Sequence, residues 1–312
     1  MNQIKTKKTD NTNSLLNPEN LKSENPFSRR QFIGSVIIAT AGAALISSFK
    51  TTRWQIGCYT RPWANYDYRV AFDGMAEAGF KFAGLMTSDK GRLITADTTA
   101  EDANTIGQEA KSRGLKIVSA YSDIDVRKSI VNGIYGMKRI IDNLNTCGCS
   151  NLLLGGIGNP ELVDDYYKVV AECIDYAAAK GVGISVKPHG GLNATGSECR
   201  AIIKKVGHKN FGIWYDPGNI YYYSDGQLDP VDDAKEVAGM VVGMSVKDFL
   251  PPKNVDVTPG TGMVDFPKVL AHLRQGGFTQ GPLIVECLSP GDLAHINVEA
   301  LKARQFLDKL IS

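Results

Sequence analysis

The chain has 312 residues, of which 43% are hydrophobic and 22% are charged, and its formal net charge is +2. This length suits one barrel of about 250 residues plus a tail, and the composition is that of a globular protein with a large core. No basic run occurs beyond the N-terminus, so charge gives no basis for nucleic-acid binding. A catalyst that acts on a small molecule fits these properties better than a protein that binds a polyanion.

The N-terminal part differs from the rest. Residues 1–26 are rich in Asn, Lys, Ser and Glu and lack apolar periodicity, so we expect disorder there. Arg29 and Arg30 precede an apolar run at 35–49 that is rich in Ala, Gly and Ser, a pattern typical of a twin-arginine export signal. The run is shorter than the roughly 20 residues of a membrane-spanning helix. The alternative is a chance arginine pair beside a buried helix.

We therefore predict a disordered tail and export signal over residues 1–52. The sequence shows no convincing cleavage site after the apolar run, so the signal could remain as a membrane anchor. The protein is expected to be periplasmic, or held at the membrane facing the periplasm.

From residue 53 onward, short β-rich runs alternate with longer helical patterns, as in parallel βα units. The predicted strands are 54–59, 80–86, 115–121, 151–154, 182–187, 211–215, 241–246 and 283–287. The predicted helices include 100–112, 127–146, 161–180, 197–206, a broken one near 231–238, 265–275 with Asp265 as its N-cap, and 293–310. Eight such units predict an α/β fold, a single (β/α)8 TIM barrel over residues 53–312. No G-x-G-x-x-G follows the first strand, which argues against a dinucleotide-binding fold.

The six cysteines are interpreted as buried thiols rather than disulfides, because most fall in predicted strands or helices. Cys147 and Cys149 form a C-x-C pair without further metal ligands nearby, so no chemistry is assigned to them.

In such barrels the functional groups project from the carboxyl ends of the strands. Asp216 and Glu286 each follow an apolar strand run, and a buried carboxylate must be paired, protonated or bound to a cation. A divalent metal suits such carboxylates, and His189, in a loop after the fifth strand, could be a third ligand. The alternative is an ion pair with Lys187, Lys247 or Arg61, which would need no metal.

Other strand exits supply further candidates. Lys187, His189 and Lys247 are predicted to be catalytic, with acid/base work favoured over a Schiff base for Lys187. The predicted substrate-binding residues are Tyr59, Arg61, Trp63, Tyr121, Asn219 and Tyr221. Aromatic rings can stack on the apolar faces of a sugar, and at least one tyrosine of the run 221–223 should face the pocket. His208, His272 and His295 are expected at the surface.

Four motifs occur in order along the second half of the chain: YDPGN at 215–219, VKD at 246–248, GTGMVDF at 260–266 and IVE at 284–286. Together they resemble the xylose-isomerase-like TIM barrel family, and the resemblance covers about residues 54–310. It implies a divalent ion such as Mn²⁺, Zn²⁺ or Mg²⁺, held by Glu, Asp, His and Glu from strands five to eight. It also implies isomerisation or epimerisation of sugars by proton transfer beside a carbonyl, although other members dehydrate keto-cyclitols or cut nucleic acid.

The chain departs from that family pattern at two positions. Lys187 stands where the fifth strand usually carries Glu, and Ser245 stands where His is common, so only Asp216 and Glu286 match the usual ligands. We expect a metal-assisted isomerase or epimerase of a sugar or keto-sugar that forms an enediolate. Two alternatives remain open: a keto-sugar lyase, that is a dehydratase or hydratase, and a non-catalytic exported sugar-binding protein. The oligomeric state is left open.

Overall fold

A computed structural model describes residues 54–312, and the structural statements below concern that part of the chain. The predicted tail and export signal over residues 1–52 lie outside the described residues. Between residues 54 and 312, no helix combines the length and the apolar character needed to cross a membrane.

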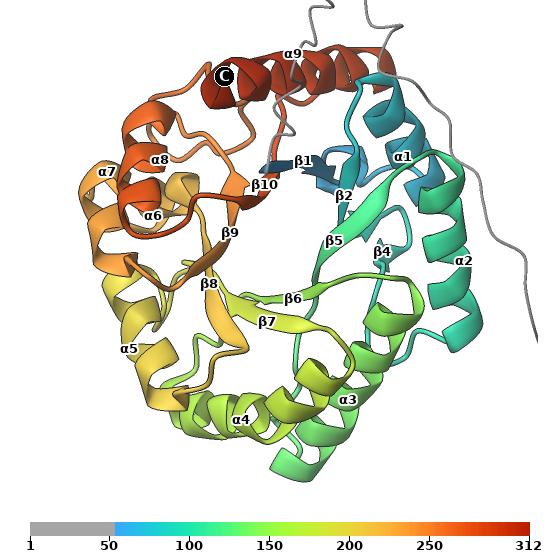
Figure 1. Ribbon diagram of the computed structural model, residues 1–312, viewed down its shortest axis with the longest axis vertical. Coiled ribbons are helices and arrows are strands. Elements are labelled where there is room, and N and C mark those ends of the chain that lie inside the picture. The colour runs from blue at the N-terminus through green and yellow to red at the C-terminus, as the bar shows by residue number, and fades with distance from the viewer. Residues whose placement is uncertain (1–53) are drawn as a thin grey trace, which may run out of the picture. The chain divides into compact units, whose positions relative to one another are not determined.

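Eight parallel strands close into a barrel, and helices surround it (Figure 1). The strands, in their order around the barrel, are β1 (Trp54–Tyr59), β10 (Gly281–Val285), β9 (Val241–Val246), β8 (Phe211–Tyr215), β7 (Gly183–Val186), β6 (Asn151–Leu154), β5 (Lys116–Tyr121) and β2 (Phe82–Leu85). This closure confirms the predicted (β/α)8 barrel. Apart from β1 with β10, neighbouring barrel strands follow one another along the chain, so successive βα units lie side by side.

The longer helices are α1 (Tyr68–Glu77), α2 (Ala100–Ser112), α3 (Ile130–Thr146), α4 (Val163–Ala179), α5 (Gly196–Val206), α8 (Phe266–Gln275) and α9 (Leu293–Ile311). Three short 3-10 turns are η1 (Arg61–Trp63), η2 (Pro160–Leu162) and η3 (Ala234–Val237). Asp265 caps α8 as predicted, since its carboxylate accepts the Lys268 backbone N–H at 3.1 Å. A small hairpin of β3 (Thr87–Ser88) and β4 (Gly91–Arg92), which the sequence did not indicate, lies after β2.

The broken helix predicted near 231–238 is present as two short pieces, and a further helix that the sequence did not indicate precedes it. The segment after β8 forms α6 (Pro217–Tyr223) at once, and α7 (Pro230–Asp233) and η3 follow. Pro217 occupies the first turn of α6, where its missing N–H costs nothing, and Asp216 is the N-cap that accepts the Asn219 N–H at 3.0 Å. The residues read as a strand exit therefore already begin a helix.

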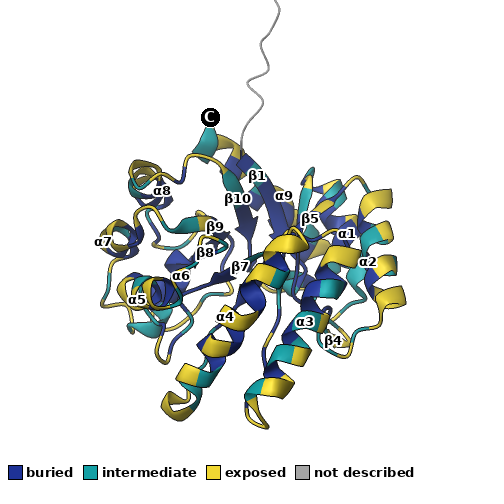
Figure 2. Cartoon of the chain, turned by 60° about the horizontal axis from the view of Figure 1, so that its bottom comes forward, coloured by how far each residue is buried: buried dark blue, intermediate teal, exposed yellow. Residues whose placement is uncertain are grey.

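Two apolar layers hold the barrel together. The larger layer lies between the strands and the helices, and Figure 2 shows the buried strands enclosed by helices that expose their outer faces. A smaller cluster contains Tyr59, Met86, Val118, Leu153, Trp214 and Ile284. The rings of Tyr59 and Trp214 meet at 6.4 Å between centroids. These side chains alternate along their strands with those of the larger layer, so they fill the barrel interior.

Glycines make room for the two large rings. A Cβ on Gly243 would lie 2.3 Å from the Trp214 ring, and a Cβ on Gly84 would lie 2.2 Å from the Tyr59 ring. Each ring therefore lies against bare backbone of a neighbouring strand. This packing fills the barrel below its carboxyl end.

All six cysteines lie within the described residues, and each is buried and unpaired. The prediction of buried thiols is therefore confirmed. Cys287 follows β10 rather than lying in it, and burial raises the pKa of its thiol to about 12.

Candidate functional site

Strand alternation brings four ionisable side chains to the carboxyl end of the barrel. Asp216 follows inward-facing Trp214 by two residues, and Glu286 follows Ile284 in the same way. Lys187 comes directly after β7, and Lys247 directly after β9. Between 0% and 4% of each of these four residues is exposed. We call Lys187, Asp216, Lys247 and Glu286 the charged cluster.

The two ammonium groups lie between the two carboxylates. Lys187 Nζ is 2.8 Å from both Glu286 oxygens and 3.1 Å from Asp216 Oδ2. Lys247 Nζ is 2.5 Å from Glu286 Oε1 and 3.2 Å from Asp216 Oδ2. The formal charges of the cluster therefore sum to zero, which is what burial of ionised groups requires.

Polar neighbours complete the hydrogen bonds of the charged cluster. Ser245 Oγ donates to Glu286 Oε2 at 2.6 Å and accepts from Trp214 Nε1 at 3.1 Å. Asn219 accepts from Lys247 Nζ at 3.0 Å and donates to the Pro188 carbonyl at 2.7 Å. Ser245, which the sequence marked only as a departure from the family pattern, thus supports Glu286 directly.

The charges within the cluster keep Glu286 and Lys247 ionised. Burial alone would raise the pKa of Glu286, but Lys187, Lys247 and Arg61 together hold that pKa well below its usual range. Burial alone would lower the pKa of Lys247, but Asp216 and Glu286 raise it well above its usual range. Glu286 is therefore a carboxylate and Lys247 an ammonium at neutral pH.

His189 lies beside the charged cluster, between two tyrosine rings. Its ring centroid is 5.9 Å from that of Tyr121 and 5.6 Å from that of Tyr223. Burial, followed by the positive charges of Lys187 and Lys247, lowers the pKa of His189 from about 6.5 to about 3. The imidazole is therefore neutral at neutral pH, and a ring nitrogen can accept a hydrogen bond.

The Tyr121 ring lies close to both His189 and Lys187. Lys187 Nζ lies 5.6 Å from the centre of the Tyr121 ring, and the Arg92 guanidinium lies 4.5 Å from it. Tyr223 is the member of the tyrosine run 221–223 that contacts His189, in line with the expectation that one of them faces the pocket. Arg92, on β4, was not singled out from the sequence, because the hairpin that carries it was not predicted.

The remaining predicted substrate-binding residues are spread more widely. Arg61 pairs with Asp256 at 3.0 Å and contacts the Cys287 sulfur, beside the mouth. Tyr59 is fully buried in the barrel and donates to Ser119 at 3.0 Å. Trp63 is also fully buried, and its Nε1 donates to Asn297 of α9 at 2.9 Å. Tyr221 stacks on Phe249 at 5.4 Å.

Trp63 therefore packs against α9, and Tyr221 packs against the segment that follows β9. Tyr59 lies deeper in the barrel than a residue that binds substrate at the mouth.

Asp248 explains the glycine spacing of the 260–266 motif. Its Oδ2 accepts the backbone N–H groups of Gly260 at 2.9 Å and Gly262 at 2.8 Å, and its Oδ1 accepts that of Val264 at 3.1 Å. A Cβ on Gly262 would lie 2.3 Å from Asp248 Oδ1, so the loop can close on the carboxylate only with glycine there. This contact ties the loop to the exit of β9, next to Lys247.

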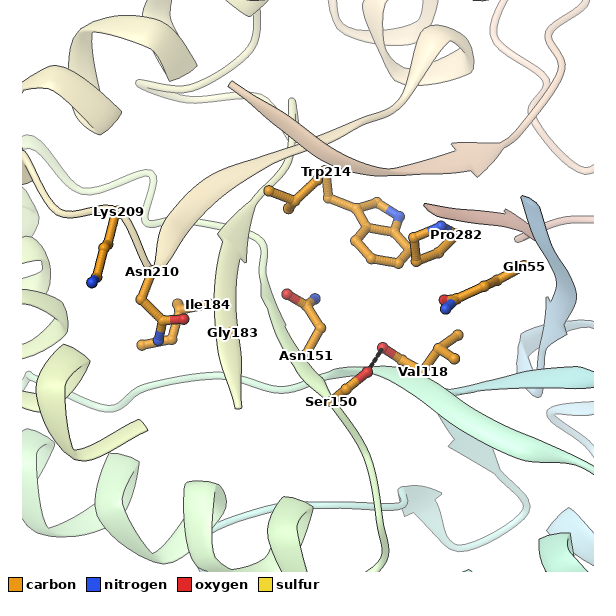
Figure 3. Close-up of a pocket in the computed structure, with 11 residues that line it drawn as sticks. Gln55, Val118, Ser150, Asn151, Gly183, Ile184, Lys209, Asn210, Trp214 and Pro282 are labelled. Atoms are coloured by element: carbon orange, nitrogen blue, oxygen red, sulfur yellow. Dashed lines mark hydrogen bonds between the residues drawn. The ribbon is translucent and has the colours of Figure 1, made fainter. Parts of the chain in front are cut away.

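The opposite end of the barrel holds a cavity of about 250 Å³ (Figure 3). Figure 3 shows Asn151, Trp214 and Gln55 around it, and Ser150 donating to the Val118 carbonyl at 3.2 Å. Its lining comes largely from the amino ends of strands, and Lys209 is its one charged residue. The ionisable groups that acid/base chemistry would need therefore gather in the charged cluster and not at this cavity.

The charged cluster does not fit a divalent ion. Asp216 and Glu286 come together at the barrel mouth as expected, but each carboxylate contacts the same two ammonium groups, those of Lys187 and Lys247. Within residues 54–312, no three His, Cys, Asp or Glu side chains gather as a metal site would need. This arrangement gives no support to the expectation that Asp216, Glu286 and His189 form a metal site. The alternative of ion pairs with Lys187 and Lys247 is what the structure contains.

Known proteins resemble the chain in sequence and in fold. The probable L-ribulose-5-phosphate 3-epimerase UlaE of Mycoplasma pneumoniae is 31% identical over 115 residues, or 36% of this chain and 36% of that protein. The chain thus matches only about a third of the length of that curated relative. A D-psicose 3-epimerase, solved in the presence of D-fructose, superposes with a TM-score of 0.66 at 15% identity. That match covers 82% of this chain and 99% of the epimerase.

A third similar protein is a xylose isomerase-like TIM barrel protein of Mycobacterium smegmatis, solved in complex with magnesium. It superposes with a TM-score of 0.64 at 17% identity, over 84% of this chain and 99% of that chain. At these identities the structural likeness concerns the fold. Residues 72–310 match the family described as "Xylose isomerase-like TIM barrel". With the closed barrel and the strand-end motifs, this match shows that the chain belongs to the xylose isomerase-like TIM barrel family.

Proposed function

We propose that the protein is an epimerase or isomerase of a sugar or keto-sugar that moves a proton on the carbon next to a carbonyl. The observation that carries the proposal is the buried charged cluster at the carboxyl end of the barrel, with neutral His189 beside it. Support comes from the relatives, because the UlaE protein is named as a sugar 3-epimerase and one structural neighbour is a D-psicose 3-epimerase.

Each member of the site has a role in this reaction. The Lys187 and Lys247 ammonium groups donate hydrogen bonds to the substrate carbonyl oxygen and stabilise the negative charge of the enediolate. Their contacts to Asp216, at 3.1 and 3.2 Å, are longer than those to Glu286, so a substrate oxygen would displace Asp216 first. His189, next to both lysines, takes the proton from carbon as the negative charge of the enediolate develops beside it and raises its pKa. In an isomerisation His189 returns the proton to the neighbouring carbon, whereas in an epimerisation the Lys187 ammonium protonates the opposite face of the enediolate. Tyr121 and Asn219 orient the sugar.

The test is proton NMR of the purified protein with a panel of ketoses and keto-sugars in deuterated water. D-fructose, D-psicose and D-tagatose represent the ketoses. We expect a C-epimer or an aldose–ketose isomer that carries solvent deuterium at the reacting carbon. A Lys187→Met variant should lose this activity, whereas Lys268→Met, which breaks an exposed ion pair with Asp265, should keep it. Binding of sugar without deuterium incorporation in any substrate would favour the non-catalytic sugar-binding alternative.

A lyase is the second candidate, favoured by the cluster itself. Lys187 and Ser245 replace two of the usual ligands, while His189, once it has taken the proton, could pass it to a departing hydroxide. The first step is the same removal of a proton, after which hydroxide leaves the next carbon. An unsaturated or hydrated product in the NMR experiment would assign the lyase activity.

We also propose, from the sequence alone, that residues 1–52 direct export. Replacing both Arg29 and Arg30 by Lys should retain the protein in the cytoplasm, as measured by cell fractionation.

A further inference from the structure

The carboxylate oxygens of the charged cluster have no free place for a metal ion. Glu286 Oε1 contacts both lysine nitrogens, and Glu286 Oε2 contacts Lys187 Nζ and Ser245 Oγ. Asp216 Oδ2 contacts both lysine nitrogens, and Asp216 Oδ1 accepts the Asn219 backbone N–H. All four oxygens therefore already accept hydrogen bonds, at 2.5 to 3.2 Å.

We propose that the Lys187 ammonium is the resident cation of this site, taking the position between Asp216 and Glu286 that a divalent ion would need. The protein is then independent of divalent metal. Lys187 Nζ is within 3.1 Å of three of the four oxygens, a central position that no other side chain of residues 54–312 shares.

The position of Lys187 is held firmly. Its backbone N–H donates to the Leu154 carbonyl at 3.2 Å, and its own carbonyl accepts from Asn193 Nδ2 at 2.8 Å. The side chain is 1% exposed. Moving the ammonium out of the cluster would leave two buried carboxylates facing Lys247 alone, which is unfavourable in a site that excludes water. A metal ion would therefore have to displace a buried, fully paired charge.

Lys247 reinforces the same exclusion. Its ammonium, 4% exposed, lies on the same carboxylates and is fixed by Asn219 at 3.0 Å. A divalent ion placed next to two ammonium groups at these distances would be repelled by both. In the proposed reaction, on which this last step rests, the lysine N–H groups take over the polarisation of the substrate carbonyl that a Lewis acid would otherwise supply.

The test is metal binding by the purified full-length protein, which requires no substrate and is independent of the proposed reaction. Manganese content after purification, and titration with millimolar Mn²⁺ followed by electron paramagnetic resonance, should reveal no stoichiometric site. Activity, where found, should be unchanged by EDTA. One bound Mn²⁺ per chain that is lost in Asp216→Asn would overturn the proposal.

A variant that gains Mn²⁺ binding provides a second test of the proposal. Lys187→Glu places a third carboxylate where the ammonium lies, so it should bind one Mn²⁺ and become more heat-stable when the ion is added. Lys268→Glu makes the same charge change at the surface, next to Asp265, and should bind no Mn²⁺ stoichiometrically. A folded Lys187→Glu protein without a Mn²⁺ site would count against the proposal. If that variant does not fold, the wild-type measurement decides alone.

Discussion

The Lys187 ammonium nitrogen lies 2.8 Å from both carboxylate oxygens of Glu286, across the mouth of the barrel. The two residues are 99 positions apart in the chain and come from β-strand exits that do not neighbour each other in the sheet. Together with Lys247, Lys187 turns two buried carboxylates into a neutral, hydrogen-bonded group, and this pairing decides which chemistry is available here.

Replacing Glu286 by Gln should strongly destabilise the protein. The change leaves Lys187 and Lys247 buried with one carboxylate between them, and loss of one partner of a buried ion pair costs about 3–5 kcal/mol. Urea denaturation measures this loss. Glu236→Gln, which breaks an exposed pair with Arg200, is the matched control and should change little. Equal effects of the two substitutions would contradict the importance of the buried pair.

Replacing Ser245 by Ala should cost about 1–3 kcal/mol, because the Nε1 of Trp214 and one oxygen of Glu286 both lose a hydrogen-bond partner in the barrel interior. The change should also shift the fluorescence of Trp214 and lower activity, since Glu286 gains freedom to move. Ser112→Ala, at the exposed end of α2, is the control and should leave both readouts unchanged. An unshifted fluorescence spectrum with full activity would argue against this contact.

Replacing Gly262 by Ala should disrupt the loop that closes on Asp248. The new Cβ would meet Asp248 Oδ1 at 2.3 Å and the Phe249 carbonyl at 2.5 Å, so the loop must move away from the exit of β9. We expect a lower melting temperature and a higher KM. Gly158→Ala is matched, because nothing lies within 4 Å of its Cβ position, and should behave as wild type. Similar behaviour of both variants would mean that the loop is not held as described.

His189 should make stability depend on pH in acid. Its pKa is about 6.5 when unfolded and about 3 in the folded protein, so between these values the unfolded chain binds a proton that the folded chain does not. Stability is therefore complete above about pH 6.5 and falls as pH decreases towards 3, by at most about 1.4 kcal/mol per pH unit from this group.

Denaturation of wild type and His189→Asn between pH 3 and 6.5 checks the direction of this pH dependence. The variant should lose stability less steeply than wild type as the pH falls. Near neutral pH, the two plots of stability against pH should have the same slope. Parallel slopes throughout the acid range would show that His189 titrates normally in the folded state. Titration of its imidazole by NMR gives the folded pKa directly.

Much of this molecule follows from local sequence. The strands at 54–59, 151–154, 211–215 and 241–246 occur as predicted, because β-rich runs between glycines and helical patterns encode βα units. The alternation of side chains along a strand also puts Asp216 and Glu286 inside the barrel mouth, so their meeting was predictable from their positions at two strand ends.

Only the tertiary structure decided which charged groups contact these carboxylates and which aromatic residues lie beside them. Strand-end positions left Lys187, Lys247, Arg61 and a metal ion as competing partners, whereas the register of the closed barrel brings both ammonium groups within 3.2 Å of the carboxylates. In the same way, Trp63 turns to Asn297, 234 residues later, and Tyr223 instead of Tyr221 reaches His189. Such contacts depend on how distant strands and helices are placed in space, which residue spacing along the chain does not encode.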